Sequence, residues 1–293
     1  MPTQIVAVLC EGPHDVAFLN RILKTDGYAQ AERTKLGSYP APMDRLLVQE
    51  AKESEVESLN IEELRRRLLP SHVLNRDETY LFLYALGGDS KQAERERLLR
   101  SFHTFAPKAG QIPVIPSDTQ LTVLYFFDAD NQGESVRRAQ INREVATTLS
   151  IEEAGLFQAQ GEIRSILGLR LGCYVFCEIS SDKGKLENII LPLMQQGNEP
   201  IFEAAKSFLD THHDPDRLKI SKFRTSGHTI VEKHEGKHKY DLPKSLIGTA
   251  GQLQVSGAAN SVCIGRTDYL TLTKIQHSSK CQEILAFFKK ATD

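Results

Sequence analysis

The sequence predicts an α/β fold: a mostly parallel sheet with helices on both faces, plus inserted helices and a C-terminal extension. Two observations support this prediction. Four runs have the length of strands and are apolar along both faces, namely residues 5–10, 79–86, 121–127 and 172–179. Each run leads into a stretch with helical features, and strands that alternate with helices and are buried on both sides form parallel sheets.

The first strand, IVAVLC, ends at the turn Glu11-Gly12-Pro13. The apolar positions from Val16 to Leu23 recur with helical spacing, so a helix is expected directly after the turn. Residues 28–75 interrupt the alternation of strands and helices. They contain a charged amphipathic stretch at 44–69, which Pro70 ends, and the sequence therefore predicts a helical insertion there.

The three remaining strands continue the pattern. The run 79–86 ends in Gly87-Gly88 and precedes a helix near 90–105. The run 121–127 is the most hydrophobic in the chain, stops at Asp128-Ala129-Asp130, and precedes a helix that extends to about 149. The run 172–179 leads to a helix around 186–196, which contains Glu187.

Two regions follow from this pattern. Residues 1–200 form one domain that includes the insertion, and residues 201–293 form an extension packed on the same domain. The extension begins with a helix at 201–210, continues as a basic loop at 217–244 and a Gly/Ser/Thr-rich stretch without strong periodicity at 246–275, and closes with a helix at 278–290.

Charge is distributed unevenly along the chain. The net charge is −2, so a surface that attracts a polyanion must be local. The basic loop carries eight Lys or Arg against three acids. It is either a phosphate-binding segment, with Lys237 and Lys239 as contacts, or a solvated loop. His228, His234 and His238 lie in this loop without partners at zinc spacing and are expected to be surface residues.

The cysteines and the hydropathy exclude other classes. The five cysteines include no pair of Cys/His clusters at finger spacing, and Cys173 and Cys177 are expected to be buried thiols. No apolar run approaches the roughly 20 residues of a membrane helix. Reduced cysteines and the lack of a signal peptide predict a cytoplasmic protein without membrane association.

Acidic residues and glycines follow the predicted strands. In parallel α/β sheets, ligands collect at the carboxyl ends of the strands. Glu11 follows the first strand, Asp128 and Asp130 follow the third, and glycines follow the second. Carboxylates bind Mg²⁺, which takes hard oxygen ligands, and glycines let backbone amides approach phosphate. The pattern therefore predicts a magnesium and phosphate site.

The segments VAVLCEGPHD, FLYALGG and YFFDADNQG together resemble the Toprim family. Within this family the EGxxDxxFL form and the run GKLEN are most similar to the OLD-like nuclease branch. The resemblance covers about 190 residues and concerns motifs more than spacing, because the stretch between Glu11 and Asp128 is longer than a minimal Toprim domain needs. The insertion accounts for the excess.

The resemblance implies a role for each residue of the site. Glu11 would be a general acid/base or metal ligand, and Asp128 and Asp130 would hold Mg²⁺ or Mn²⁺. Glu187 would bind a second metal ion, and Asp15 would be a further ligand or a cap of the first helix. A lysine late in the chain would serve the site, with Lys244 and Lys239 as candidates. The phosphate-binding glycines would be Gly12, Gly87 and Gly88.

Three functions are compatible with these features. The first is a metal-dependent nuclease that acts on DNA or RNA. The second is a non-catalytic Toprim module for nucleic-acid binding or assembly in DNA repair or defence. The third, a phosphatase-like fold, expects its Asp-x-Asp after the first strand rather than the third. No GxxxxGK[ST] loop is present, so an ATPase would be a separate partner. The oligomeric state stays open.

Overall fold

The computed structural model describes residues 2–52, 69–86, 88, 91–107, 110, 112–178, 180–227 and 229–293. Its centre is a seven-stranded sheet with the order β2-β3-β4-β1-β5-β7-β6. Four neighbouring strands run parallel: β4 (Thr79–Ala85), β1 (Gln4–Cys10), β5 (Gln120–Asp128) and β7 (Leu169–Phe176). They correspond to the four apolar runs, and the prediction of an α/β fold with a mostly parallel sheet is confirmed.

Both edges of the sheet are antiparallel, which the sequence pattern did not indicate. On one side β3 (His72–Arg76) pairs with β4, and β2 (Ala29–Gln30) pairs with β3. On the other side β6 (Glu162–Ile166) pairs with β7. Asp77 (φ 51°) lies in the turn between β3 and β4, and Leu167 (φ 50°) and Gly168 (φ 79°) form the two-residue turn between β6 and β7. Positive φ values are typical of tight hairpin turns.

The predicted helical insertion at 28–75 is therefore only partly helical. It contains β2, a 3₁₀ turn at Leu36–Ser38, α2 (Met43–Lys52) and most of β3. Residues 53–68, which contain most of the predicted amphipathic stretch, lie outside the described residues. The prediction missed β3 because HVLNR is short and half polar, and its alternation shows only once it is paired with β4.

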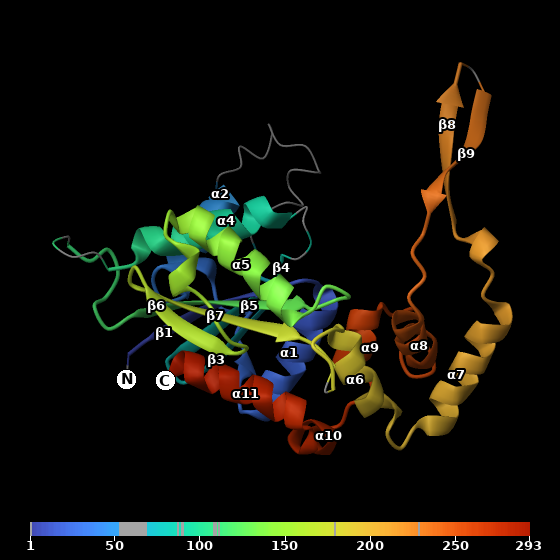
Figure 1. Ribbon diagram of the computed structural model, residues 1–293. Coiled ribbons are helices and arrows are strands. Elements are labelled where there is room, and N and C mark those ends of the chain that lie inside the picture. Colours follow the sequence, from blue (N-terminus) through green and yellow to red (C-terminus); the bar gives the residue numbers. More distant parts are fainter. Residues whose placement is uncertain are drawn as a thin grey trace.

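Helices cover both faces of the sheet (Figure 1). Side chains alternate along β1, so that Val6 and Val8 contact one layer and Ile5 and Ala7 the other. The first layer contains α1 (Pro13–Thr25), α6 (Leu186–Gln195), α9 (Asn260–Arg266), α10 (Leu272–His277) and α11 (Ser279–Thr292). The second contains α2, α4 (Gln92–Phe105) and α5 (Glu134–Leu149), together with Leu156 and Phe157, which follow the 3₁₀ turn at Glu153–Gly155.

The C-terminal region packs into the first layer. Phe287 and Phe288 of α11 contact Phe126 of β5, with ring centroids 5.5 and 5.1 Å apart. The stretch 246–275, where no strong periodicity was found, forms α9, α10 and most of α8 (Leu242–Gly251). None of these helices exceeds ten residues, which is too short to display a repeated apolar stripe.

The predicted basic loop at 217–244 is largely a β-hairpin, so the loop assignment was wrong. After α7 (Glu199–His212) and a 3₁₀ turn at Pro215–Arg217, β8 (Lys219–Ser226) and β9 (Thr229–Lys237) pair antiparallel. Figure 1 shows this hairpin, which we call the arm, standing away from the rest of the molecule. Among the described residues, no helix is long and apolar enough to cross a membrane.

Candidate active site

The first residue of the site follows β1. Glu11 leaves the strand with its backbone N–H donating to the carbonyl of Phe126 at 3.2 Å, which extends the pairing of β1 with β5. Its side chain turns to the neighbouring strand end, where Oε2 accepts the backbone N–H of Asp128 at 3.0 Å. Glu11 and Asp128 therefore meet because β1 and β5 are adjacent and parallel, as the sequence predicted from their position after two strands.

The loop after β7 brings α6 to the same place. Asp130 and Gly184 exchange two backbone hydrogen bonds of 2.6 and 2.8 Å. Gly184 has a φ of +116°, and a Cβ at this position would lie 3.0 Å from the backbone nitrogen of Glu178, so glycine is required here. As a result α6 begins beside β5, and the N–H of Leu186 donates to Oδ1 of Asp128 at 2.8 Å.

The next two acids belong to helix starts. Glu187, in the first turn of α6, is almost fully buried. His14 donates through Nδ1 to its Oε1 at 3.0 Å, and Nζ of Lys244 lies 3.7 Å from the same oxygen. Asp15, in the first turn of α1, accepts the N–H of Gly12 at 2.6 Å. The helix-capping alternative for Asp15 is thus present in the structure.

All of the buried carboxylates among the described residues lie in this cluster. They are Asp15, Asp128 and Glu187. A buried carboxylate is costly unless it is protonated, hydrogen-bonded or paired with a cation. Burial and the nearby Glu11 carboxylate raise the pKa of Asp128 to about 8, and the hydrogen bond from Leu186 only partly offsets them. Burial and the charge of Asp128 also hold the pKa of Asp15 well above its usual range.

Glu187 differs from the other two because cations face it. Burial alone would raise its pKa, but the hydrogen bond from His14 and the charge of Lys244 outweigh burial, so the pKa of Glu187 is lowered. Burial lowers the pKa of Lys244, but the negative charges of Glu187, Asp241, Asp128 and Asp15 raise it further, and the net shift is upward. The site therefore joins two carboxyls that resist ionisation to an ionised Glu187–Lys244 pair.

Asp130 lies at the rim. It adopts a left-handed conformation with φ 50°, which aspartate tolerates better than most residues, and its side chain is 46% exposed. Arg137 of α5 donates through Nε to the carbonyl of Asp128 at 2.8 Å and through a terminal nitrogen to Oδ2 of Asp130 at 2.9 Å. Arg137 thus fixes both ends of the Asp128–Asp130 turn.

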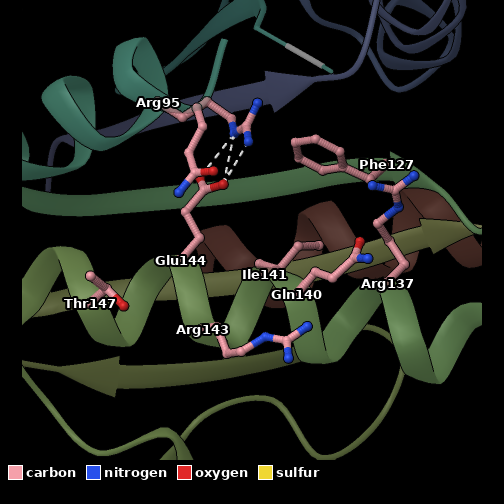
Figure 2. A pocket seen from close by; sticks show the side chains of 9 residues that line it. Arg95, Phe127, Arg137, Gln140, Ile141, Arg143, Glu144 and Thr147 are labelled. Carbon is pink, nitrogen blue, oxygen red and sulfur yellow. Dashed lines mark hydrogen bonds and ion pairs between the residues drawn. The ribbon is translucent and has the colours of Figure 1, made fainter. Parts of the chain in front are cut away.

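Arg137 also lines a pocket of about 330 Å³ beside α4 and α5 (Figure 2). Arg95 lines this pocket and forms an ion pair with the carboxylate of Glu144, with the shortest contact at 2.6 Å. Arg95 also donates to the carbonyls of Leu86 and Gly88 at 2.8 and 3.0 Å. It therefore holds the chain that leaves β4, the segment in which the sequence predicted phosphate-binding glycines.

A second cleft, of about 430 Å³, is lined by Asp130. Lys183 and Lys185 from the loop before α6 line one part, and Lys239 and Tyr240 from the segment after the arm line another. An ion pair between Lys185 and Asp241 ties the two parts together. The cleft joins the rim of the acidic cluster to the base of the arm.

The structure thus gathers most, but not all, of the predicted residues. Glu11, Asp15, Asp128, Glu187 and Lys244 converge, Asp130 lies at the rim, and Lys239 lines the adjoining cleft. The N–H of Gly12 is engaged by Asp15, and Gly88 contacts Arg95 through its carbonyl. Lys237 lies on the arm, 3.9 Å from Asp216. Gly87 and His228 lie outside the described residues.

Sequence reasoning missed His14 and Arg137. His14 stands inside the Glu11-Gly12-Pro13-His14-Asp15 segment, so its proximity to the site was visible, but its partner Glu187 is 173 positions away. Arg137 lies in the helix after Asp130, and a basic residue in such a helix is too common to be diagnostic.

The carboxylates of the site can bind Mg²⁺ only if a substrate and water supply the remaining ligands. No group of three or more His, Cys, Asp or Glu side chains is placed to hold a metal ion in the part of the chain that the structure describes. Mg²⁺ is usually bound by one or two carboxylates together with water and substrate phosphate. Asp128 with Glu11 or Asp130 supplies that number, and the raised pKa of Asp128 indicates a carboxyl that a cation would stabilise in its ionised form.

Comparisons of the chain with protein-family models, with curated proteins and with solved structures give no match.

Proposed function

We propose that the protein is a Toprim-like, Mg²⁺- or Mn²⁺-dependent enzyme that processes phosphodiesters in nucleic acid, most simply as a nuclease. The observation that carries the proposal is the gathering of the buried carboxylates, Asp15, Asp128 and Glu187, around the ends of β1 and β5 with Lys244 beside them. Carboxyls with perturbed pKa values cluster at functional sites, which supports the proposal.

The residues divide into three roles in this proposal. Asp128, with Glu11 or Asp130, would hold the metal ion, which when bound supplies Lewis-acid stabilisation of charge on the phosphoryl group. Glu11, whose carboxylate is already oriented by the N–H of Asp128, would accept the proton of the attacking water. Lys244, which is 45% exposed, would contact a phosphate oxygen while its partner Glu187 holds it in place.

A second function, non-catalytic binding of nucleic acid, has its own support. Glu11, Asp15, Asp128, Asp130 and Glu187 each have one carboxylate oxygen held by a protein donor, and a preformed three-ligand metal group is missing from the described residues. A module whose acids serve only to join strand and helix ends would have these features.

Cleavage assays and calorimetry separate the two functions. Wild-type protein is incubated with labelled DNA and RNA in Mg²⁺, in Mn²⁺ and in EDTA, and metal binding is measured by titration calorimetry. We expect metal-dependent cleavage that Asp128→Asn reduces at least about 100-fold, since it removes a metal ligand. The control is Asp118→Asn, the same change at an exposed turn before β5, away from the site. Metal binding without cleavage of any nucleic acid would favour the non-catalytic function.

A further inference from the structure

The arm has few contacts that explain why it is folded. β8 and β9 pair only with each other, and a two-stranded hairpin alone is marginally stable in water. Among the described residues of the two strands, none is buried, and only Ile220, Val231 and Glu235 are even partly covered. Both faces of the arm are therefore exposed to solvent, and a bound partner would stabilise it.

One face of the arm exposes two large apolar side chains, alongside Ser221, Thr225, Glu232 and His234. Phe223 pairs with Glu232 and Thr225 with Ile230, so Phe223 and Ile230 are diagonal neighbours on the same face. Phe223 is 79% exposed and Ile230 is 71% exposed. Single exposed apolar residues are common, but two large ones side by side near the tip of a projecting hairpin indicate a contact surface.

The other face is cationic. Lys222 pairs directly with Lys233, and like charges in opposed positions destabilise a hairpin. Glu235 lies 3.1 Å from Lys222 and 2.6 Å from Arg224, so one carboxylate serves two cations and leaves an excess of positive charge on this face. The strands and their turn carry five Lys or Arg and two Glu, in a chain whose net charge is −2. An anionic partner would relieve the repulsion.

The base of the arm leads to the acidic cluster. Lys239 and Tyr240, just after β9, line the cleft that also contains Asp130, Lys183 and Lys185. Figure 1 shows the arrowhead of β7 pointing toward the side of the molecule where the arm stands. A long ligand held by the arm could therefore extend along the cleft to Asp128.

We propose that the arm binds duplex DNA by lying in its major groove and presents one strand to the acidic cluster through the cleft. The B-DNA major groove admits a two-stranded β-ribbon, whereas the deep, narrow groove of duplex RNA does not. Phe223 and Ile230 face the apolar edges of the bases, and the long side chains of Lys222 and Lys233 reach past the edges of the ribbon to the phosphates of the groove walls. This substrate assignment rests on the proposed function, but the binding itself does not require catalysis.

The test measures binding without cleavage. A labelled DNA duplex of about 25 base pairs is titrated in EDTA at several salt concentrations, and the change is followed by fluorescence anisotropy. Changing Lys222→Gln with Lys233→Gln should raise Kd at least about tenfold at ~0.1 M salt and reduce the slope of log K against log salt by up to about 2. Phe223→Ser with Ile230→Ser should weaken binding and leave the salt slope unchanged.

A matched pair of lysines controls for charge. Lys206→Gln with Lys289→Gln removes the same charge from exposed residues of α7 and α11 and should leave Kd within about twofold. The melting temperature of the Lys222/Lys233 variant should change little, because the lost ion pair of Lys222 with Glu235 is offset by removal of the repulsion between the two lysines. An unchanged melting temperature excludes misfolding as the cause of lost binding.

The outcomes separate the arm from the active site. The arm proposal is overturned if the wild type does not bind the duplex, binds single-stranded DNA or duplex RNA equally well, or binds as before when the arm is changed. It is also overturned if the arm variants only convert a dimer to a monomer. Arm-dependent binding by a wild type that cleaves neither DNA nor bis(p-nitrophenyl) phosphate leaves the arm proposal standing and rejects the proposed catalysis.

Discussion

The carboxylate of Glu11 accepts the backbone N–H of Asp128 at 3.0 Å, although the two residues are 117 positions apart. This hydrogen bond joins the ends of two adjacent parallel strands. It holds the side chain of Glu11 beside the backbone of Asp128. It also brings the charge of Glu11 close to Asp128, and that charge is the second cause, after burial, of the raised pKa of Asp128.

The raised pKa of Asp128 predicts that metal-free protein loses stability as the pH rises. The native state holds a proton on Asp128 up to about pH 8, whereas the unfolded state releases it near pH 4. The stabilising contribution is complete below the unfolded pKa and is lost as pH rises through the native pKa. The free energy of unfolding should therefore fall by on the order of 1 kcal/mol per pH unit between these values. Asp128→Asn should flatten this dependence.

Thermal unfolding in EDTA between pH 5.5 and about 8 is the measurement, with the difference between wild type and Asp128→Asn plotted against pH. The comparison cancels the titration of histidines, which both proteins share. Some slope should persist in the variant, because the pKa of Asp15 is raised in the same direction. Parallel curves for the two proteins would contradict the prediction.

Lys244 should matter for turnover more than Lys239 does. Lys244 lies 3.7 Å from the buried Glu187, so Lys244→Met leaves that carboxylate with His14 as its remaining partner and removes the proposed phosphate contact. We expect kcat to fall at least about tenfold, equivalent to about 1.4 kcal/mol. Lys239→Met, in the adjoining cleft, should raise KM and change kcat little. If Lys239→Met lowered kcat and Lys244→Met raised only KM, Lys239 would be the lysine that serves the site.

Arg137 is expected to be a positioning residue. It holds the carbonyl of Asp128 and the carboxylate of Asp130 from two nitrogens, a fork that lysine does not reproduce. Arg137→Lys should keep the charge and still lower metal affinity several-fold. Arg143→Lys, six residues further along the same helix and exposed, is the matched control. Calorimetric titration with Mn²⁺ gives the affinities, and equal values for both variants would remove Arg137 from the site.

Gly184 links backbone geometry to the site. In Gly184→Ala the new Cβ would lie 2.9–3.0 Å from Glu178 in a backbone with φ +116°, so we expect a loss of about 2 kcal/mol or more in stability and a displaced Asp130. Gly197→Ala is the control, because it introduces the backbone strain without the steric clash. Gly197 has a φ of +73°, and a Cβ added there would meet no neighbouring atom within 4 Å. That control should cost only about 1 kcal/mol, measured by denaturant unfolding.

Burial on both faces is what made the sheet predictable from sequence. The strands that contain Val8, Leu83, Val123 and Val175 are apolar over most of their length, and helices cover them on both faces. Glu11 and Asp128 could be placed together for the same reason, since adjacent parallel strands end at one edge. The edge strand β6 and the arm carry no such signal, because side chains exposed to water are under little constraint to be apolar.

The partners of Glu187 could not be predicted for a different reason. Lys244 reaches Glu187 because α8 begins at Leu242 with its cap, Asp241, ion-paired to Lys185. That contact depends on how short helices without strong periodicity pack against α6. Gly227, between two short segments that contain β-branched and aromatic residues, was the available signal for the arm, and the excess of lysines around it obscured the strand pattern.

The position of α11 has a consequence for synthesis on the ribosome. Phe287 and Phe288 of α11 cover Phe126 and Tyr174 of the central strands. Among the helices of the layers around the sheet, α11 leaves the ribosomal exit tunnel after all the others. Until then, one face of β5 and β7 stays uncovered while β1 to α6 are already available to pair. A nascent chain would therefore present an aromatic surface to chaperones from the synthesis of β7 until α11 emerges, and slow elongation before residue 279 would prolong that exposure.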